Sequence, residues 1–223
     1  MTRLRHVTLS IGGGALWALA AGTILFGVAG RLDLPQIWAL LAVTATLGTL
    51  TVIRIGPGEV RRRHARGSGD RGRVTTTLVR LGVLATLILG ALDAGRLGWS
   101  RVPAVLQIVA GVGFAVSLAY AFWAVAVNRY YTHEIRVQVE QNHRVVDAGP
   151  YRHVRHPSYL GLLVVLPAAA LALGSWWALI PAVGSWLVLI RRTQIEDRML
   201  VSGLSGYADY ASRVRYRLVP GLW

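Results

Sequence analysis

Residues 102–127 read VPAVLQIVAGVGFAVSLAYAFWAVAV, an apolar stretch without a charged side chain. An α-helix needs about 20 such residues to cross a hydrocarbon core of about 30 Å. Three earlier stretches, at 8–29, 34–53 and 77–95, have comparable length and character. The sequence therefore predicts four transmembrane helices.

The composition agrees with an all-α integral membrane protein. Of the 223 residues, 54% are hydrophobic and only 15% are charged, and the mean hydropathy is +0.48. A soluble domain of this length is less apolar. The chain has no cysteine, which excludes disulfides, thiolate nucleophiles and cysteine-ligated metal sites.

A fifth apolar region, residues 157–190, predicts a C-terminal helical hairpin. Gly174 and Ser175 interrupt it, so each arm has about 15 residues and reaches about 22 Å. Whether such arms span the membrane fully stays open. We divide the chain into a lipid- and substrate-facing half, residues 1–127, and a C-terminal catalytic region, residues 128–223.

The arginines predict the orientation. All 24 basic residues are arginine, and 21 of them fall on one side if the N-terminus is cytoplasmic. Only Arg31, Arg96 and Arg101 fall on the other. Because cytoplasmic loops retain basic residues, we expect both termini inside. This placement also explains the net charge of +14 without a nucleic-acid partner.

Two basic segments have plain interpretations. The first apolar stretch follows Arg3 and Arg5 and is too long for the core of a signal peptide, which predicts an uncleaved anchor. The arginine-rich residues 54–73 are typical of a solvated cytoplasmic loop in contact with anionic lipid. The sequence gives this loop no further role.

The most informative polar segment is GPYRHVRHPSYLG at 149–161. Pro157 suits the first position of a helix, with His156 near its cap. The free N–H groups of such a helix attract anionic groups, and Arg152 and Arg155 add positive charge. The Gly149–Pro150 turn lets Tyr151 and Tyr159 approach each other and offer aromatic surfaces to a ring or a sulfonium. This combination indicates a binding site.

A second polar cluster follows the hairpin at 191–198. Arg192 and Glu196 are four residues apart, so they share one helical face. A hairpin returns the chain to the membrane face that it left. We therefore expect this cluster beside residues 149–161, with both contributing to one pocket.

Other chemical motifs are absent from the sequence. It contains no Walker loop, no HExxH and no GxSxG, and its glycine clusters lie within apolar stretches. His153 and His156 have no further ligand at a useful interval, so we predict no metal site.

The C-terminal region resembles the isoprenylcysteine carboxyl methyltransferase family and the related phospholipid N-methyltransferases. The matching patterns are HRVVxxGPY at 143–151, RHPSYxG at 155–161, RxxxE at 192–196 and GYxxYxxxV at 206–214. The closing LVPGLW at 218–223 fits as well. The ordered set covers about the last 90 residues. The first half is similar only as generic membrane helices.

The resemblance implies an S-adenosylmethionine-dependent methyltransferase with a cofactor pocket at the cytoplasmic face. Carried over by position, the residues implied to bind the cofactor are Gln138, His143, Val146, Gly149, Tyr151, Arg155, His156, Pro157, Tyr159 and Glu196. The implied catalytic pair is Arg192 and Glu196.

Methyl transfer from a sulfonium is an in-line displacement that needs no nucleophilic side chain. We interpret Arg192 as a clamp for an anionic acceptor and Glu196 as its partner or as a contact to the cofactor. For an amine acceptor, Glu196 would accept the proton. The chain lacks lysine and cysteine and resembles a bacterial inner-membrane protein. The resemblance implies a lipid-like or isoprenoid acceptor: an acid is favoured, while an amine or thiol stays open, as does the oligomeric state.

Two alternatives come from other functional classes. Membrane sterol reductases share a similar C-terminal layout and would use NADPH, but the proline at 157 and the preceding GPY favour the methyltransferase. The other alternative is a non-enzymatic transporter or scaffold; transport pathways usually need charges within the spans, and these are scarce here.

Overall fold

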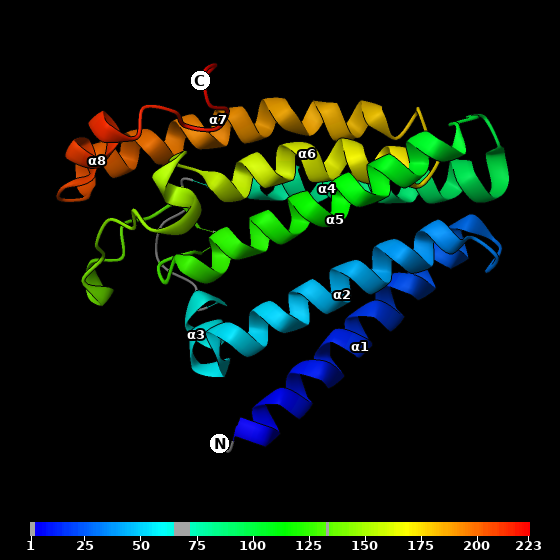
Figure 1. Cartoon of the computed structure of the whole chain (residues 1–223), viewed down its shortest axis with the longest axis horizontal. Helices are drawn as coiled ribbons and strands as arrows, with labels where there is room; N and C mark the ends of the chain where they lie inside the picture. Colours follow the sequence, from blue (N-terminus) through cyan, green and yellow to red (C-terminus); the bar gives the residue numbers. More distant parts are fainter. Residues whose placement is uncertain (1–2, 65–71, 133) are drawn as a thin grey trace.

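The computed structural model describes residues 3–64, 72–132 and 134–223, which contain helices and loops and no strand. Figure 1 shows the arrangement. The elements in order are α1 (Arg3–Ala29), α2 (Pro35–Ile55), α3 (Pro57–His64), α4 (Arg73–Leu92), η1 (Asp93–Leu97), α5 (Ala104–Val127), η2 (Val139–Gln141), η3 (Gly149–Arg152), α6 (Pro157–Ala172), α7 (Leu179–Gly203) and α8 (Tyr207–Arg213).

A helix is present at each of the four predicted spans. Within the described residues, α1, α2, α4 with η1, and α5 are long and apolar enough to cross a membrane. α4 begins earlier than predicted, at Arg73, because the threonines that precede the apolar stretch continue the helix. Large apolar side chains such as Leu16, Ile108 and Val116 are exposed, as expected where lipid covers the surface.

The helices form a bundle with one splayed member. α4, α5, α6 and α7 run side by side, whereas α1 meets α2 at one end and diverges from it toward the other (Figure 1). Both termini, α3 and α8 lie toward the same end of the bundle. The inside location of that end stays a prediction, as does the division at residue 128.

The predicted hairpin is present, but its second arm is longer than expected. α6 covers Pro157–Ala172, and the chain turns at Gly174 and Ser175. α7 does not end at Ile190 but continues to Gly203. The reason is that residues 191–202 contain no proline or glycine, so nothing stops the helix where the apolar residues end. The extension carries Arg192 and Glu196.

Asp93 joins the loops at the opposite end of the bundle. Its carboxylate accepts hydrogen bonds from the backbone N–H groups of Trp99 and Ser100 and from the hydroxyls of Ser100 and Ser175. Ser175 belongs to the hairpin turn. Asp93 therefore fixes this turn to the α4–α5 connection, and its burial is balanced by hydrogen bonds.

α5 and α6 pack closely at Gly161. A Cβ atom at this position would lie 2.9 Å from the Ser117 carbonyl oxygen and 2.7 Å from the Ala121 Cβ. Small residues let helix backbones approach in this way within a membrane. The contact sets the position of α6, whose first turn carries the polar motif.

Part of the arginine-rich segment 54–73 is not a solvated loop. Residues 57–64 form α3, and Arg63 points inward to donate hydrogen bonds to Glu59 and to the Val125 carbonyl oxygen. The i, i+4 spacing of Glu59 and Arg63 favours this short helix. Residues 65–71 lie outside the described part of the chain.

Candidate active site

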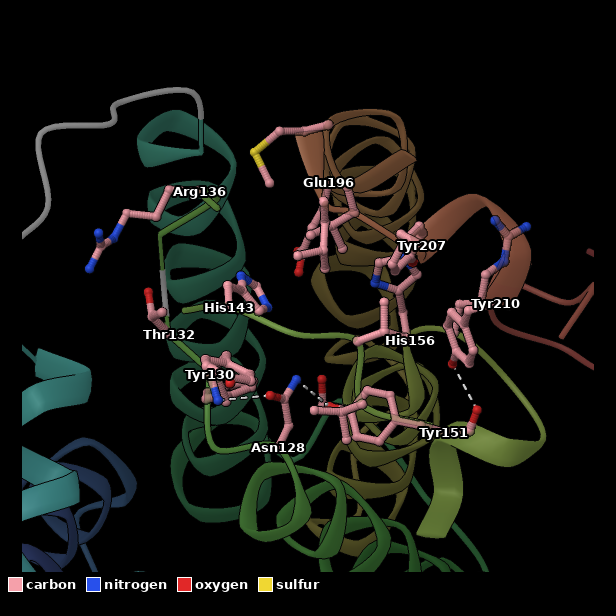
Figure 2. Close-up of a pocket in the computed structure, with 18 of the residues that line it drawn as sticks. Asn128, Tyr130, Thr132, Arg136, His143, Tyr151, His156, Glu196, Tyr207 and Tyr210 are labelled. Atoms are coloured by element: carbon pink, nitrogen blue, oxygen red, sulfur yellow. Dashed lines mark hydrogen bonds between the residues drawn. The ribbon is translucent and has the colours of Figure 1, made fainter. Parts of the chain in front are cut away.

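A cavity of about 700 Å³, counting its open mouth, lies where the two polar segments meet. Figure 2 shows Tyr130 and His143 on one side, Glu196 on α7, and His156, Tyr207 and Tyr210 on the other side. The hairpin thus brings residues 149–161 and 191–198 together, as predicted. The residues lining the cavity include Asn128, Tyr130, Tyr131, Thr132, Glu134, Arg136, His143, Arg144, Val146, Tyr151, Arg155, His156, Tyr159, Glu196, Met199, Tyr207 and Tyr210.

Tyr159 joins the two members of the predicted catalytic pair. Its hydroxyl donates a hydrogen bond of 2.6 Å to Glu196 Oε2 and accepts one of 2.7 Å from Arg192 Nε. The Arg192 guanidinium also lies over the Tyr159 ring, 5.6 Å from its centre. Arg192 and Glu196 are therefore connected through a phenol that comes from the first turn of α6.

Arg192 lies behind this phenol and does not line the cavity. It is only 5% exposed. Its Nη1 donates to the Gly72 carbonyl oxygen and to the hydroxyls of Thr75 and Thr76 at the start of α4. The N-terminal half of the chain thus holds a residue of the C-terminal site in place.

Asp197 organises the other side of α7. It accepts hydrogen bonds from Arg155, Arg217 and the Tyr207 hydroxyl, and its Oδ1 lies 3.4 Å from His156 Nε2. Burial acts to raise the pKa of Asp197, but the hydrogen bonds from His156 and Arg217 and the charge of Arg155 outweigh it and hold the pKa far below its usual range. The ionised carboxylate fastens the C-terminal segment to the start of α6.

His143 and Tyr130 form an aromatic wall opposite α7. Their ring centres are 4.3 Å apart. Gln138 supports both: its side-chain amide donates to the Tyr130 carbonyl oxygen, and its backbone N lies 3.3 Å from His143 Nδ1. Burial is the main cause that lowers the pKa of His143, so the imidazole is neutral at pH 7.

Tyr151 closes the base of the cavity. Gly149, at φ +57°, begins η3 with a left-handed backbone that places Tyr151 two residues later. Asn128 Nδ2 donates to the Tyr151 hydroxyl, and Tyr210 donates to the Tyr151 carbonyl oxygen (Figure 2). Pro157 occupies the first position of α6 with His156 as its N-cap, as predicted.

The structure places the predicted site residues in two groups. Those that line the cavity are His143, Val146, Tyr151, Arg155, His156, Tyr159 and Glu196. Those that lie behind it are Gln138, Gly149, Pro157 and Arg192. The second group supports residues of the first: Gln138 contacts His143, and Arg192 contacts Tyr159.

Sequence reasoning missed several lining residues and the central role of Asp197. Asn128, Tyr130 and Tyr131 follow α5 directly, and a polar and aromatic run at the end of a membrane span was their only signal. Tyr207 and Tyr210 stood within a pattern of the resemblance but were not given a role in the site.

Two buried donors in the cavity wall have no acceptor. The Nε atoms of Arg136 and Arg155 are buried and make no hydrogen bond within the described residues. An unsatisfied buried donor is costly. Arg136 Nε lies 3.7 Å from Glu134 Oε2, too far for a hydrogen bond.

Comparison with known proteins relates this segment to a family. Residues 109–202 match the sequence model of the isoprenylcysteine carboxyl methyltransferase (ICMT) family. The segment includes most of α5, both hairpin helices and most of the cavity wall, so the resemblance inferred from the motifs is confirmed.

The chain is also similar to protein-S-isoprenylcysteine O-methyltransferase B of Arabidopsis thaliana. The two are 32% identical over 92 residues, which cover 40% of this chain and 47% of that protein. The similarity thus spans about half of the relative. The helices α1 to α4 and α8 lie outside the family segment, although α4 holds Arg192 and α8 supplies Tyr207 and Tyr210.

Proposed function

We propose that the protein is an S-adenosylmethionine-dependent methyltransferase that acts at the membrane on a lipid-like or isoprenoid acceptor. The observation that carries the proposal is the cavity that the family segment builds around Tyr159 and Glu196. O-methylation of a carboxylate is the favoured reaction, and the name of the Arabidopsis relative, an O-methyltransferase, supports an oxygen acceptor.

The residues of the cavity suit the proposed cofactor. The tyrosine and histidine rings offer faces to an adenine ring and to a sulfonium cation. Glu196 offers a carboxylate to hydroxyl or amine groups. Arg136 and Arg155 line the cavity, and their guanidinium charges suit the carboxylate of the amino-acid part.

In this proposal, the protein contributes alignment and exclusion of water. S-adenosylmethionine, when bound, would supply a methyl group activated by the sulfonium. The Tyr159 hydroxyl and the Glu196 carboxylate hold each other in place beside the reacting methyl group. The rings of Tyr131 and Tyr151 would separate that methyl group from water. An ionised acceptor oxygen needs no general base. Glu196 would take up the proton of an amine acceptor.

Arg192 acts in this proposal as a positioning residue. The sequence predicted a direct clamp on an anionic acceptor, but the guanidinium lies behind the Tyr159 hydroxyl and is held by Thr75 and Thr76. Through Tyr159, it orients the Glu196 carboxylate. Its positive charge also stabilises negative charge close to the cavity.

We further propose a bacterial cytoplasmic membrane as the location, with the cavity at the cytoplasmic face. The positive-inside distribution of the arginines supports this orientation. The two termini at one end of the bundle are compatible with it (Figure 1).

Calorimetry on detergent-solubilised protein tests the cofactor. S-adenosylhomocysteine should bind and NADPH should not; the reverse result would indicate the alternative, a reductase related to the sterol reductases. His156→Ala should weaken binding, because His156 lines the cavity and stacks on Tyr159. The matched control is His153→Ala, which removes an exposed histidine of the same motif and should bind normally.

A screen with radiolabelled methyl donor on membrane lipid extracts then tests the acceptor class. Label in base-labile methyl esters supports a carboxylate acceptor. Label in stable N-methyl or S-methyl products would replace this part of the proposal.

A further inference from the structure

A second and larger cavity lies beside the first, between α1, α2, α3 and α5. It has a volume of about 1980 Å³, counting the parts open to the outside. Its walls are mostly apolar, and they extend from Trp17 and Thr44 near the middle of the first two spans to the ends of these helices near Arg63. The divergence of α1 from α2 creates this space (Figure 1).

The basic residues that line the cavity lie toward the end where α3 lies. These residues are Arg63 and His6. The Arg63 side chain is 8% exposed. Its Nε donates to Glu59 at 3.0 Å and its Nη1 to the Val125 carbonyl oxygen at 2.8 Å. Its Nη2 makes no hydrogen bond within the described residues.

Tyr131 and Thr132 line both cavities and connect them. Burial is the main cause that raises the pKa of the Tyr131 phenol; the charge of Glu196 adds to the effect, whereas Arg192 and Arg63 oppose it. The phenol is thus within electrostatic range of Arg63 on one side and of the Arg192–Glu196 pair on the other. Tyr131 and Thr132 are thus a shared wall of the candidate active site and of the cavity that contains Arg63.

We propose that Arg63 determines acceptor specificity by binding the carboxylate of a lipid acid whose chain fills the apolar cavity. This inference rests on the proposed function, and it gives that function its acceptor subsite. Arg192 donates to Tyr159, Gly72, Thr75 and Thr76 and lines neither cavity, whereas Arg63 lines the apolar cavity together with Tyr131 and Thr132.

The shape and charge of the cavity select this class of ligand. An apolar chain gains by leaving water for the apolar walls. A planar guanidinium recognises a carboxylate better than a hydroxyl, because both partners are charged and their geometries match. Glu59 holds Arg63 in position but also offsets part of its charge. Removal of Glu59 should therefore not weaken binding of the acid.

Tryptophan fluorescence tests the site without any methyl transfer. Trp17 lines the apolar cavity, so dibromostearic acid bound there should quench its emission. We expect saturable quenching that unbrominated stearic acid reverses and that Trp17→Phe removes. Arg63→Gln should weaken binding of dibromostearic acid by about 10- to 100-fold. The neutral dibromostearyl alcohol should bind the wild type and Arg63→Gln equally.

Two further variants keep the proposal testable if Arg63→Gln does not fold. Arg63→Lys keeps the charge and should retain part of the preference for the acid, and Glu59→Gln should bind the acid at least as tightly as the wild type. Equal affinities for acid and alcohol in the wild type, or an unchanged acid affinity in Arg63→Gln, would overturn the proposal. S-adenosylhomocysteine binding is measured on the same samples, so a failure at Arg63 is distinguished from a failure of the methyltransferase proposal.

Discussion

At the scale of single residues, the site depends on one hydroxyl group. Tyr159 connects Arg192 to Glu196 by two short hydrogen bonds and stacks on His156. Both of its partners are ionisable groups; Arg192 is buried and Glu196 is half-buried. Hydrogen bonds to charged groups in such surroundings are stronger than those between neutral groups.

Tyr159→Phe removes this hydroxyl and keeps the ring. We expect turnover to fall by about 10- to 100-fold, because the lost hydrogen bonds leave Glu196 free to move. Affinity for S-adenosylhomocysteine and the melting temperature should change little, since the stacking on His156 remains. Single-turnover methyl transfer measures the first quantity, and calorimetry and thermal unfolding measure the others.

Arg192→Ala should abolish turnover while it largely spares cofactor binding, because Arg192 lies behind the cavity wall. Arg192→Lys restores a charge without the planar donors and should recover only part of kcat. Arg191→Ala, at the exposed neighbour, is the matched control. Methyl transfer by Arg192→Ala at the wild-type rate would refute this role.

At the scale of elements, the α5–α6 contact positions the first turn of α6. Tyr159 and His156 lie at the start of the helix that Gly161 brings against Ser117 and Ala121. A shift of α6 by a fraction of an ångström would move the Tyr159 hydroxyl relative to α7. The length of α7 matters equally, because its polar extension carries Glu196 and Asp197.

Gly161→Ala should destabilise the protein by about 1–3 kcal/mol, because the added methyl group overlaps the backbone of α5. Gly184→Ala is the control: its Cβ would meet nothing within 4 Å, and alanine favours a helix by up to about 1 kcal/mol over glycine. Thermal unfolding in one detergent compares the two. Equal melting temperatures would show that α5 and α6 can separate at no cost.

At the scale of the whole molecule, the two ends of the bundle differ in chemistry. One end carries α3, α8 and the candidate active site, while the other consists of short loops around Asp93 (Figure 1). The N-terminal half contributes α4 to the support of Arg192 and α1 and α2 to the second cavity. The two halves are therefore structurally interdependent.

The absence of cysteine permits a direct test of orientation. Leu32→Cys and Ser212→Cys each place one exposed thiol, at opposite ends of the bundle. In intact bacterial spheroplasts, a membrane-impermeant maleimide should label Leu32→Cys at once and Ser212→Cys only after lysis. The opposite pattern would place the candidate active site outside the cell.

The sequence by itself determined the apolar spans, the start of α6 and the two polar segments of the site. These features depend on local composition: about 20 apolar residues specify a span, and a proline at the first position specifies a helix start. Three motifs of the resemblance, at 143–151, 155–161 and 192–196, lie within the segment that the family comparison matches. Local pattern did not reveal the end of α7 or the helix within residues 54–73, because polar residues form helices as readily as loops.

Only the tertiary structure decided which residues meet. It placed the Tyr159 hydroxyl between Arg192 and Glu196, set Arg192 against α4, gathered four partners around Asp197 and turned Arg63 toward the second cavity. These contacts join residues far apart in the chain, and they depend on how the helices pack and cross. An apolar period fixes which face of a helix is buried, but it does not fix the neighbour that the face meets.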